Sequence, residues 1–339
     1  MFTIIENKNL KSYNTFGIEA FCKYFVELNS VADFLELLKS DIYTSHQKLI
    51  IGGGSNILFT KDYDGLVIKN NIKGKEITFE NNNDVIVKAG AGENWNDFVI
   101  WCISHNFGGL ENLSLIPGCI GASPMQNIGA YGAEIKEVFE SLVAYDMVSG
   151  EKKIFSPQQC HFGYRESVFK NEYKNKFIIT SVSYSLKKNS PVNISYGAIS
   201  SELEAEGIKN PTIKDVSNAV VRIRKSKLPD PSEIGNAGSF FKNPEVSAQK
   251  HDELKRNFSA LVAYSLPNGN FKLAAGWLIE QCGLKGYEHN GAAVHNKQAL
   301  VLVNKNHCSG KDVFELSSYV LQKVFDKFGV TLEREVNII

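Results

Sequence analysis

The chain has 339 residues, 43% of them hydrophobic, so it is long enough for two or three compact domains with apolar cores. Its 37 basic residues balance 37 acidic ones, which leaves no overall positive field to attract nucleic acid or an anionic membrane. We therefore expect small-molecule partners and no nucleic-acid partner. The first residues lack the apolar core of a signal peptide and no window resembles a membrane span, so we expect a cytoplasmic protein with no membrane partner.

The cysteines and histidines argue against a metal centre. The six cysteines are widely scattered and contain no C-x-x-C pair, and the seven histidines form no close ligand pair. These spacings predict neither a zinc site nor a disulfide framework. We expect no structural metal.

The first third of the chain predicts helices and strands that lead into glycine-rich turns. Ser30 can cap a helix over 31–38, and the apolar run 49–51 predicts a buried strand. That strand runs into a segment typical of a nest of backbone N–H groups, which binds anions: Gly52, Gly53, Gly54, Ser55 and Asn56. The segment is not a Walker loop, because the G-K-[ST] ending is missing. A short strand over 85–89 and a helix capped by Asn94 follow.

The segment 117–132, PGCIGASPMQNIGAYG, has four glycines and suits a backbone held close to a ligand. Glycine also permits conformations in which successive N–H groups point into one concavity that binds phosphate. The residues alone leave a second interpretation open, a tightly packed loop that crosses under a sheet.

The middle of the chain predicts two antiparallel strands over 142–148 and 177–186, with a turn between them that carries Tyr164 and Arg165. That pair is either a surface ion pair or part of a site. Residues 187–211 are polar and predict a long loop, and a helix over 216–224 ends before prolines that mark a domain boundary.

The last third predicts a glycine-rich turn over 235–244 with the Ser239 hydroxyl at its apex, which a simple hairpin would also explain. A helix over 272–282, a buried strand over 299–303 and a helix over 311–328 are expected next. The final segment 332–338 alternates, so that Glu333 and Glu335 share one face of a terminal strand. Such a strand could also be a solvated edge.

Seven blocks in this order resemble one known family, the bacterial UDP-N-acetylenolpyruvoylglucosamine reductases, nearly from end to end. The blocks are Asn14-Thr-Phe-Gly17, Gly52-Gly-Gly-Ser-Asn56, Ile116-Pro-Gly-x-x-Gly-Ala122, Gln126-Asn-Ile-Gly-Ala-Tyr-Gly132, Tyr164-Arg165, Gly238-Ser-Phe-Phe-Lys-Asn-Pro244 and the closing Glu-x-Glu-Val. The segment around Tyr196 resembles the tyrosine loop of the family's longer form.

The resemblance implies an α+β fold with a two-subdomain FAD-binding part, of the type shared with vanillyl-alcohol oxidases, followed by an α+β substrate-binding domain. The boundaries we expect are 1–70 and 71–215 for the two FAD-binding subdomains and 216–329 for the substrate-binding domain, with 330–339 returning near the site. The implied enzyme is a monomer.

The resemblance also implies a reaction in peptidoglycan precursor synthesis. NADPH reduces non-covalent FAD, and the reduced flavin passes hydride to the enolpyruvyl ether of a UDP-sugar, giving UDP-N-acetylmuramate. By the same resemblance Ser239 donates the proton, Arg165 stabilises the carbanion-like carboxylate bidentately, and Glu335 shares that task, with Glu333 as the non-catalytic neighbour. Lys227 or Lys242 is expected to polarise the serine.

The remaining residues implied by the resemblance are ligand contacts. Those for FAD are Gly52, Gly53, Gly54, Ser55, Asn56, Pro117, Gly118, Gly121, Ala122, Gln126, Asn127, Ile128 and Gly129. Those for the UDP-sugar are Tyr196, Lys227, Asn243 and Gln298, with the lysine expected at the diphosphate. Asn337 stands near a position where the family often has arginine, so a flavin contact there is in doubt.

Two other functions fit parts of the pattern. A flavin oxidase of the same fold commonly tethers its cofactor through histidine or cysteine, and the glycine loop contains Cys119 but no histidine. Colour that stays with the denatured chain would indicate the oxidase. A non-catalytic UDP-sugar binding module would have lost the catalytic side chains, whereas Arg165, Ser239 and Glu335 are all present.

Overall fold

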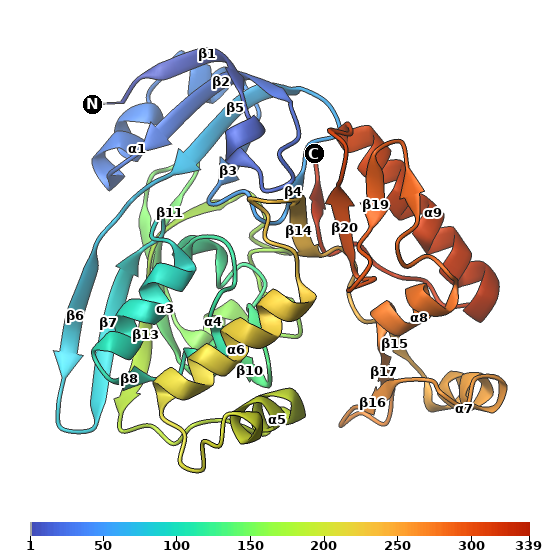
Figure 1. Ribbon diagram of the computed structural model, residues 1–339. Helices are drawn as coiled ribbons and strands as arrows, with labels where there is room; N and C mark the ends of the chain where they lie inside the picture. The colour runs from blue at the N-terminus through green and yellow to red at the C-terminus, as the bar shows by residue number, and fades with distance from the viewer. Residues whose placement is uncertain (1) are drawn as a thin grey trace. The chain divides into compact units, whose positions relative to one another are not determined.

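The structure is a computed structural model that describes residues 2–339. The chain forms two compact units (Figure 1). The first unit comprises the residues up to Lys8, Cys22–Gly53 and Asp64–Ser226, and the second comprises Asn9–Phe21, Gly54–Tyr63 and Lys227–Ile339. The expected division into three domains stays a prediction.

The first unit begins with a sheet of strand order β1-β2-β5-β3. Its strands are β1 (Ile4–Asn9), β2 (Phe21–Leu28), β5 (Tyr63–Asn70) and β3 (Lys48–Ile51), with helices α1 (Val31–Leu37) and α2 (Asp41–Ser45). The Ser30 hydroxyl accepts a hydrogen bond from the Asp33 amide at 3.1 Å, which confirms the predicted cap. Strand β3 runs parallel to β5 and leads into Gly52, which confirms the predicted strand before the glycines, although only its last residue, Ile51, is buried.

The second sheet of this unit is antiparallel, with the order β12-β11-β13-β7-β6. Its strands are β12 (Lys152–Phe155), β11 (Phe139–Asp146), β13 (Phe177–Lys188), β7 (Asp84–Gly90) and β6 (Lys75–Glu80), and β8 (Phe107–Gly108) pairs with β13. Helix α3 (Trp95–Ser104) covers one face, where Trp95 and Phe98 pack with Val87 and Val182. The predicted strands and the Asn94-capped helix are therefore confirmed.

Short elements complete the first unit around the glycine loop. They are β9 (Gly129–Ala130), β10 (Ala133–Glu134), α4 (Pro157–Cys160) and the 3₁₀ turns over 111–113, 120–122 and 135–137.

The prediction of a long loop over 187–211 is wrong in part, because helix α5 (Gly197–Ala205) lies within it. Ile199 and Leu203 are one helical turn apart and pack against α6 (Ile213–Lys227), where Val216 and Val220 form the facing stripe. The polar composition hid this helix because only two of its residues face a core.

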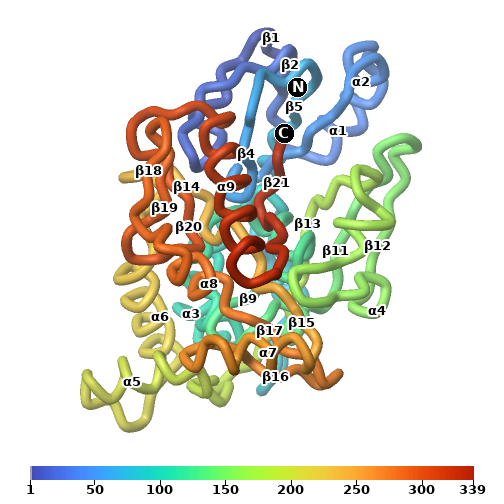
Figure 2. Tube along the Cα trace, turned by 90° about the vertical axis from the view of Figure 1, so that its right-hand side faces the viewer, coloured from blue at the N-terminus to red at the C-terminus, as the bar shows by residue number. Residues whose placement is uncertain are grey.

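The second unit is built on a sheet of order β14-β20-β19-β18 (Figure 2). Its strands are β14 (Gly235–Ser239), β20 (Val301–Asn304), β19 (Ala292–Val294) and β18 (Glu288–His289). Helix α9 (Gly310–Phe328) packs on it through Val313, Leu316 and Val320 and ends at Gly329 (φ 61°), which confirms that prediction.

Two predictions in this unit need correction. The glycine-rich segment from Gly235 is a strand rather than a turn, because it pairs with β20 across a register shift between Asn236 and Ser239. The helix expected over 272–282 begins later, as α8 (Ala275–Gln281), because the preceding residues form strand β17 (Phe271–Leu273) between two other strands. Those neighbours are β15 (Glu245–Val246) and β16 (Ala263–Ser265), with helix α7 (Ala248–Asn257) following β15.

The C-terminal segment is a regular strand only at β21 (Asn337–Ile338), which pairs in parallel with β4 (Ile57–Leu58). The predicted alternation still holds: Leu332 and Val336 are buried. Arg334 lies on their side and donates to the hydroxyls of Ser317 and Ser318 on α9. The two glutamates therefore lie on the other side, as the sequence indicated.

Candidate functional site

The two glycine segments of the first unit meet at Gly53 and Gly118. A Cβ atom added to Gly53 would lie 3.0 Å from the Gly118 Cα atom, tighter than nine in ten real Cβ contacts. One added to Gly52 would lie 3.2 Å from the Cys119 Cβ atom. Glycine therefore suits this close approach of the two backbones, and Gly118 also has a φ of +123°, which side-chain-bearing residues rarely adopt.

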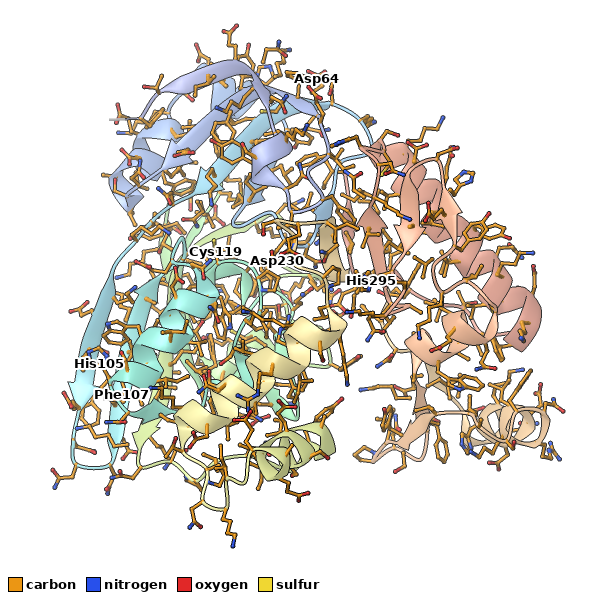
Figure 3. All side chains as sticks on the ribbon, viewed as in Figure 1. Asp64, His105, Phe107, Cys119, Asp230 and His295 are labelled. Carbon is orange, nitrogen blue, oxygen red and sulfur yellow. The ribbon has the colours of Figure 1, made fainter. Side chains whose placement is uncertain are left out.

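The amide groups of this loop separate into two sets. Those of Ile120 and Gly121 donate to the carbonyls of Glu93 and Ala91, both at 2.9 Å, so they hold the loop on the second sheet. By contrast, the amides of Gly53, Gly118 and Cys119 have no acceptor within residues 2–339. These three donors are available to an anion such as a diphosphate. Fewer amides of the segment 117–122 are thus available than the sequence predicted. Cys119 is labelled in Figure 3.

Asn127 holds the loop together from inside. Its side chain is fully buried, donates to Glu134 Oε2 and to the Gly163 carbonyl at 3.0 Å each, and accepts from the Lys136 amide at 3.1 Å. Ile128 is also buried, in the core with α3. The hydrogen-bonding groups of the Asn127 side chain are thus all used within the protein. A contact between Asn127 and the cofactor would therefore use its backbone.

Arg165 occupies a tight turn next to the glycine loop. Gly163 and Glu166 exchange two backbone hydrogen bonds across the turn, and Arg165 has the left-handed φ of +55° that is uncommon outside glycine. Its Nη2 atom donates to the Gly129 carbonyl at 2.7 Å. This geometry ties the guanidinium to the segment 126–132 and favours a site over a surface ion pair.

Arg224 lies close to Arg165 and was missed by the sequence analysis. Burial lowers the pKa of Arg224, Tyr131 opposes that shift and the Arg165 charge adds to it. The Arg224 Nε atom is buried without a hydrogen-bond partner among the described residues. The ring of Tyr131 in turn contacts that of Tyr196 edge-on at 5.3 Å. The signal was available, because Arg224 continues the apolar stripe of Val216 and Val220 on α6.

In the second unit Ser239 and Glu335 are held by adjoining backbone hydrogen bonds. Ser239 ends β14 opposite Val301. The next residue, Phe240, donates to Leu300 at 2.7 Å and accepts from the Glu335 amide at 2.8 Å. The Ser239 hydroxyl makes no hydrogen bond within the described chain. The structure therefore places the backbone segments that carry Ser239 and Glu335 side by side.

The sequence block Asn14–Gly17 has a structural role in the second unit. Thr15 donates to the Gly54 carbonyl at 3.1 Å and accepts from the Asn236 amide at 3.0 Å. The Asn56 carbonyl accepts from the Asn337 side chain at 2.9 Å, and the Asn56 side chain donates to the Glu335 carbonyl at 3.3 Å. Gly54 to Asn56 thus support β14 and the C-terminal segment within this unit.

Glu333 forms an ion pair with Lys242. Lys242 Nζ lies 2.5 Å from Glu333 Oε1, and the Glu333 side chain is largely exposed. An ammonium has three N–H donors, so this contact leaves Lys242 a candidate for polarising Ser239. Lys227 is exposed and has no ion pair within residues 2–339.

Two predicted substrate-binding residues, Asn243 and Gln298, use their side-chain oxygens for hydrogen bonds within the protein. The Asn243 Oδ1 atom accepts from the Ala275 amide at 2.9 Å, at the start of α8. The Gln298 Oε1 atom lies 3.1 Å from where Gly276 would carry a Cβ and accepts weakly from Leu300. The side-chain NH₂ groups of Asn243 and Gln298 therefore remain available to hydrogen-bond a ligand. Tyr196 is half-exposed in the first unit.

His295 is a second residue that the sequence analysis missed. Its amide donates to the Val301 carbonyl at 2.9 Å, and Val301 is the register partner of Ser239. Ser239 and His295 therefore flank Val301 on one face of the sheet. The Nδ1 atom is buried without a partner among the described residues, and burial followed by the Lys297 charge lowers the pKa of the ring (Figure 3). Nothing in the sequence around it singled this histidine out.

Within residues 2–339, no three acidic, histidine or cysteine side chains are grouped as metal ligands. No helix of that range is long and apolar enough to cross a membrane.

Comparison with known proteins assigns both parts of the chain. An FAD binding domain model matches residues 22–155, and a model of the C-terminal domain of UDP-N-acetylenolpyruvoylglucosamine reductase matches residues 230–339. The fold matches a crystal structure of that reductase from Thermus caldophilus with a TM-score of 0.70 and 22% identity, over 100% of this chain and 99% of the other.

Two relatives are similar over almost their whole length. The UDP-N-acetylenolpyruvoylglucosamine reductase of Flavobacterium johnsoniae is 51% identical over 99% of both chains. That of Chromobacterium violaceum is 48% identical over 96% of both chains. The predicted α+β class, with its FAD-binding part and substrate-binding domain, is confirmed. The chain belongs to the UDP-N-acetylenolpyruvoylglucosamine reductase family.

Proposed function

We propose that this chain is the NADPH-dependent flavoenzyme that reduces UDP-N-acetylglucosamine enolpyruvate to UDP-N-acetylmuramate. The observation that carries the proposal is the pairing of Ser239 and Glu335 through Phe240, in a chain of this family. A hydroxyl donor and a carboxylate carried on neighbouring backbone segments would suit the delivery of one proton to a carbon atom.

The first unit fits FAD. Three amides without acceptors, at Gly53, Gly118 and Cys119, would hold its diphosphate without a lysine. When bound, FAD reduced by NADPH supplies the hydride for the methylene carbon of the enolpyruvyl group. The other predicted cofactor contacts, including Gln126 and Gly129, stay part of the proposal.

Arg165 would stabilise the substrate carboxylate as negative charge grows on the neighbouring carbon. A planar guanidinium can hold a carboxylate through two parallel hydrogen bonds. Its bond to the Gly129 carbonyl leaves other N–H groups and fixes the direction in which they point. Such fixed donors cost no reorganisation at the moment of reaction.

Ser239 would give its proton to the carbon next to the carboxylate, which balances the hydride added to the methylene carbon. Glu335 would hydrogen-bond the enol-like form of that carboxylate. Lys227 would meet the diphosphate of the UDP-sugar, and Asn243, Gln298 and Tyr196 would hydrogen-bond the diphosphate or the sugar. We also propose that the enzyme is monomeric and cytoplasmic.

Anaerobic mixing tests the proposal. NADPH should bleach the flavin absorbance, and the enolpyruvyl UDP-sugar should restore it without oxygen, with UDP-N-acetylmuramate as product. Reoxidation by oxygen alone, or colour that stays with the denatured chain, would indicate the oxidase instead.

A further inference from the structure

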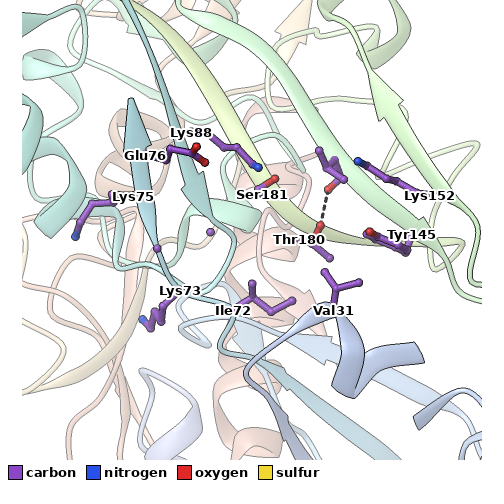
Figure 4. A pocket seen from close by; sticks show the side chains of 13 residues that line it. Val31, Ile72, Lys73, Lys75, Glu76, Lys88, Tyr145, Lys152, Thr180 and Ser181 are labelled. Carbon is purple, nitrogen blue, oxygen red and sulfur yellow. Dashed lines mark hydrogen bonds between the residues drawn. The ribbon is translucent and has the colours of Figure 1, made fainter. Parts of the chain in front are cut away.

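A pocket of about 320 Å³ lies on the second sheet of the first unit, away from all seven sequence blocks (Figure 4). Four lysines line it, Lys73, Lys75, Lys88 and Lys152, against a single carboxylate, Glu76. Its volume is at the small end of the range of ligand pockets, roughly 300 to 1,000 Å³.

The pocket opens on one face of the sheet. In the register of the strands Ser181 faces Gly90 and Val143, and Glu76 faces Lys88. Cross-strand partners carry their side chains on the same face, and Lys88 lies two residues from Gly90. These residues therefore share one face across β6, β7, β13 and β11.

The glycine loop lies on the other face. Val87, Ala89 and Val182 alternate with the pocket residues and pack with α3, in a core that includes Ile120 and Ile128 of the loop. The sheet thus lies between the pocket and the core that holds Ile120 and Ile128, and neither Gly118 nor Cys119 lines the pocket.

The charges in the pocket are only partly neutralised. Lys73 donates to the Gly92 carbonyl, and Lys75 lies 3.3 Å from Glu93. Lys88 and Lys152 make no ion pair within residues 2–339. Lysine ammonium groups bind phosphate as point charges, so two such groups in one pocket favour an anion.

A hydroxyl in the pocket adds a hydrogen-bonding group to the two lysines. Ser181 is 8% exposed, lines the pocket, and its hydroxyl has no hydrogen-bond partner among the described residues. Its neighbour Thr180, by contrast, is satisfied by the Val143 carbonyl at 3.2 Å. Figure 4 shows Ser181 between Lys88 and Lys152. The Ser181 hydroxyl is open to the pocket, so it can hydrogen-bond to a ligand there.

The rest of the lining suits an organic body. Ile72, Val31 and Val143 give apolar surface, and Tyr145 adds an aromatic ring. A phosphate ion alone would leave this wall uncovered. We propose that the pocket binds a nucleoside monophosphate, with the phosphate at Lys88, Lys152 and Ser181 and the nucleoside against Tyr145 and Ile72. This inference does not depend on the proposed reductase activity.

Calorimetric titration of the FAD-loaded enzyme with AMP, UMP and inorganic phosphate tests the proposal. We expect at least one nucleotide to saturate one site per chain, with inorganic phosphate binding more weakly. The double variant Lys88→Gln/Lys152→Gln should raise the Kd of the bound nucleotide at least tenfold. Ser181→Ala should raise that Kd severalfold. Lys187→Gln is the control, because Lys187 lies on β13, pairs with Asp84 at 3.6 Å and does not line the pocket.

Three results would overturn the proposal. One is the absence of saturable binding by both nucleotides. Another is a double variant that binds as tightly as the wild-type enzyme, which would place the nucleotide elsewhere, for instance at the substrate site. The third is loss of flavin from the double variant, read from the ratio of flavin to protein absorbance, which would make the pocket part of the cofactor site.

Discussion

The Glu335 amide donates a hydrogen bond to the Phe240 carbonyl at 2.8 Å, one residue after Ser239. This bond fixes the C-terminal segment against the end of β14. It gives Glu335 and Glu333, which stand two residues apart, different surroundings: Glu333 reaches Lys242 near the surface.

The two glutamates should therefore respond differently to the same substitution. Glu335→Gln should slow reoxidation of the reduced flavin by the enolpyruvyl substrate, by roughly the 10²-fold typical of an acid–base partner. Glu333→Gln is the matched control and should stay close to the wild-type rate, because an exposed ion pair contributes only about 0–1 kcal/mol. Stopped-flow absorbance measures both, and equal effects would contradict the assignment.

Gly235 should tolerate no side chain, since a Cβ atom there would lie 2.1 Å from the Phe16 carbonyl oxygen. We expect Gly235→Ala to lower the free energy of unfolding by about 1–3 kcal/mol, the usual cost of overpacking. Gly197→Ala is the control: nothing lies within 4 Å of its added Cβ, and it begins α5. That substitution should be neutral or stabilise the helix by up to about 1 kcal/mol in urea unfolding.

His295 should titrate below the ordinary histidine range of about 6.5. Because burial lowers its pKa in the native state, the unfolded chain takes up the proton first as the pH falls. Its contribution to stability is therefore lost between about pH 6.5 and the lower native pKa. Ring-proton NMR measures the pKa, and His295→Gln should reduce the loss of stability on acidification. A ring that titrates at or above 6.5 would contradict this expectation.

Arg165→Lys, like Glu335→Gln, should slow the half-reaction in which the enolpyruvyl substrate reoxidises the reduced flavin. A lysine keeps the charge but cannot hold a carboxylate through two parallel bonds, and we expect a loss of roughly 10²- to 10³-fold in the reoxidation step. Reduction by NADPH should be little changed. Arg222→Lys is the matched control, because Arg222 pairs with Glu202 of α5 and was not assigned to the site. Full reoxidation activity in Arg165→Lys would refute the bidentate role.

Elements with local signals could be predicted from the sequence. Helices α1 and α3 start at Ser30 and Asn94, whose side chains accept from amides three residues on. Helix α9 shows its apolar stripe and its terminal glycine directly. In each case the information lies within one or two helical turns of chain.

Elements that depend on distant partners could not be predicted. Strand β14 is rich in glycine and has little β-propensity, and it forms because β20 and Thr15 supply its hydrogen bonds. The role of Asn243 at the start of α8 is equally non-local. His295 was missed for the same reason, since its surroundings come from other segments.

The most direct test of the central claim is a comparison of the two half-reactions in Ser239→Ala. We expect NADPH to bleach the flavin at the wild-type rate, while reoxidation by the enolpyruvyl UDP-sugar slows by roughly 10²- to 10⁴-fold, because only the second step needs the proton. Equal slowing of both half-reactions, or unchanged reoxidation, would contradict the assignment of Ser239 as the proton donor.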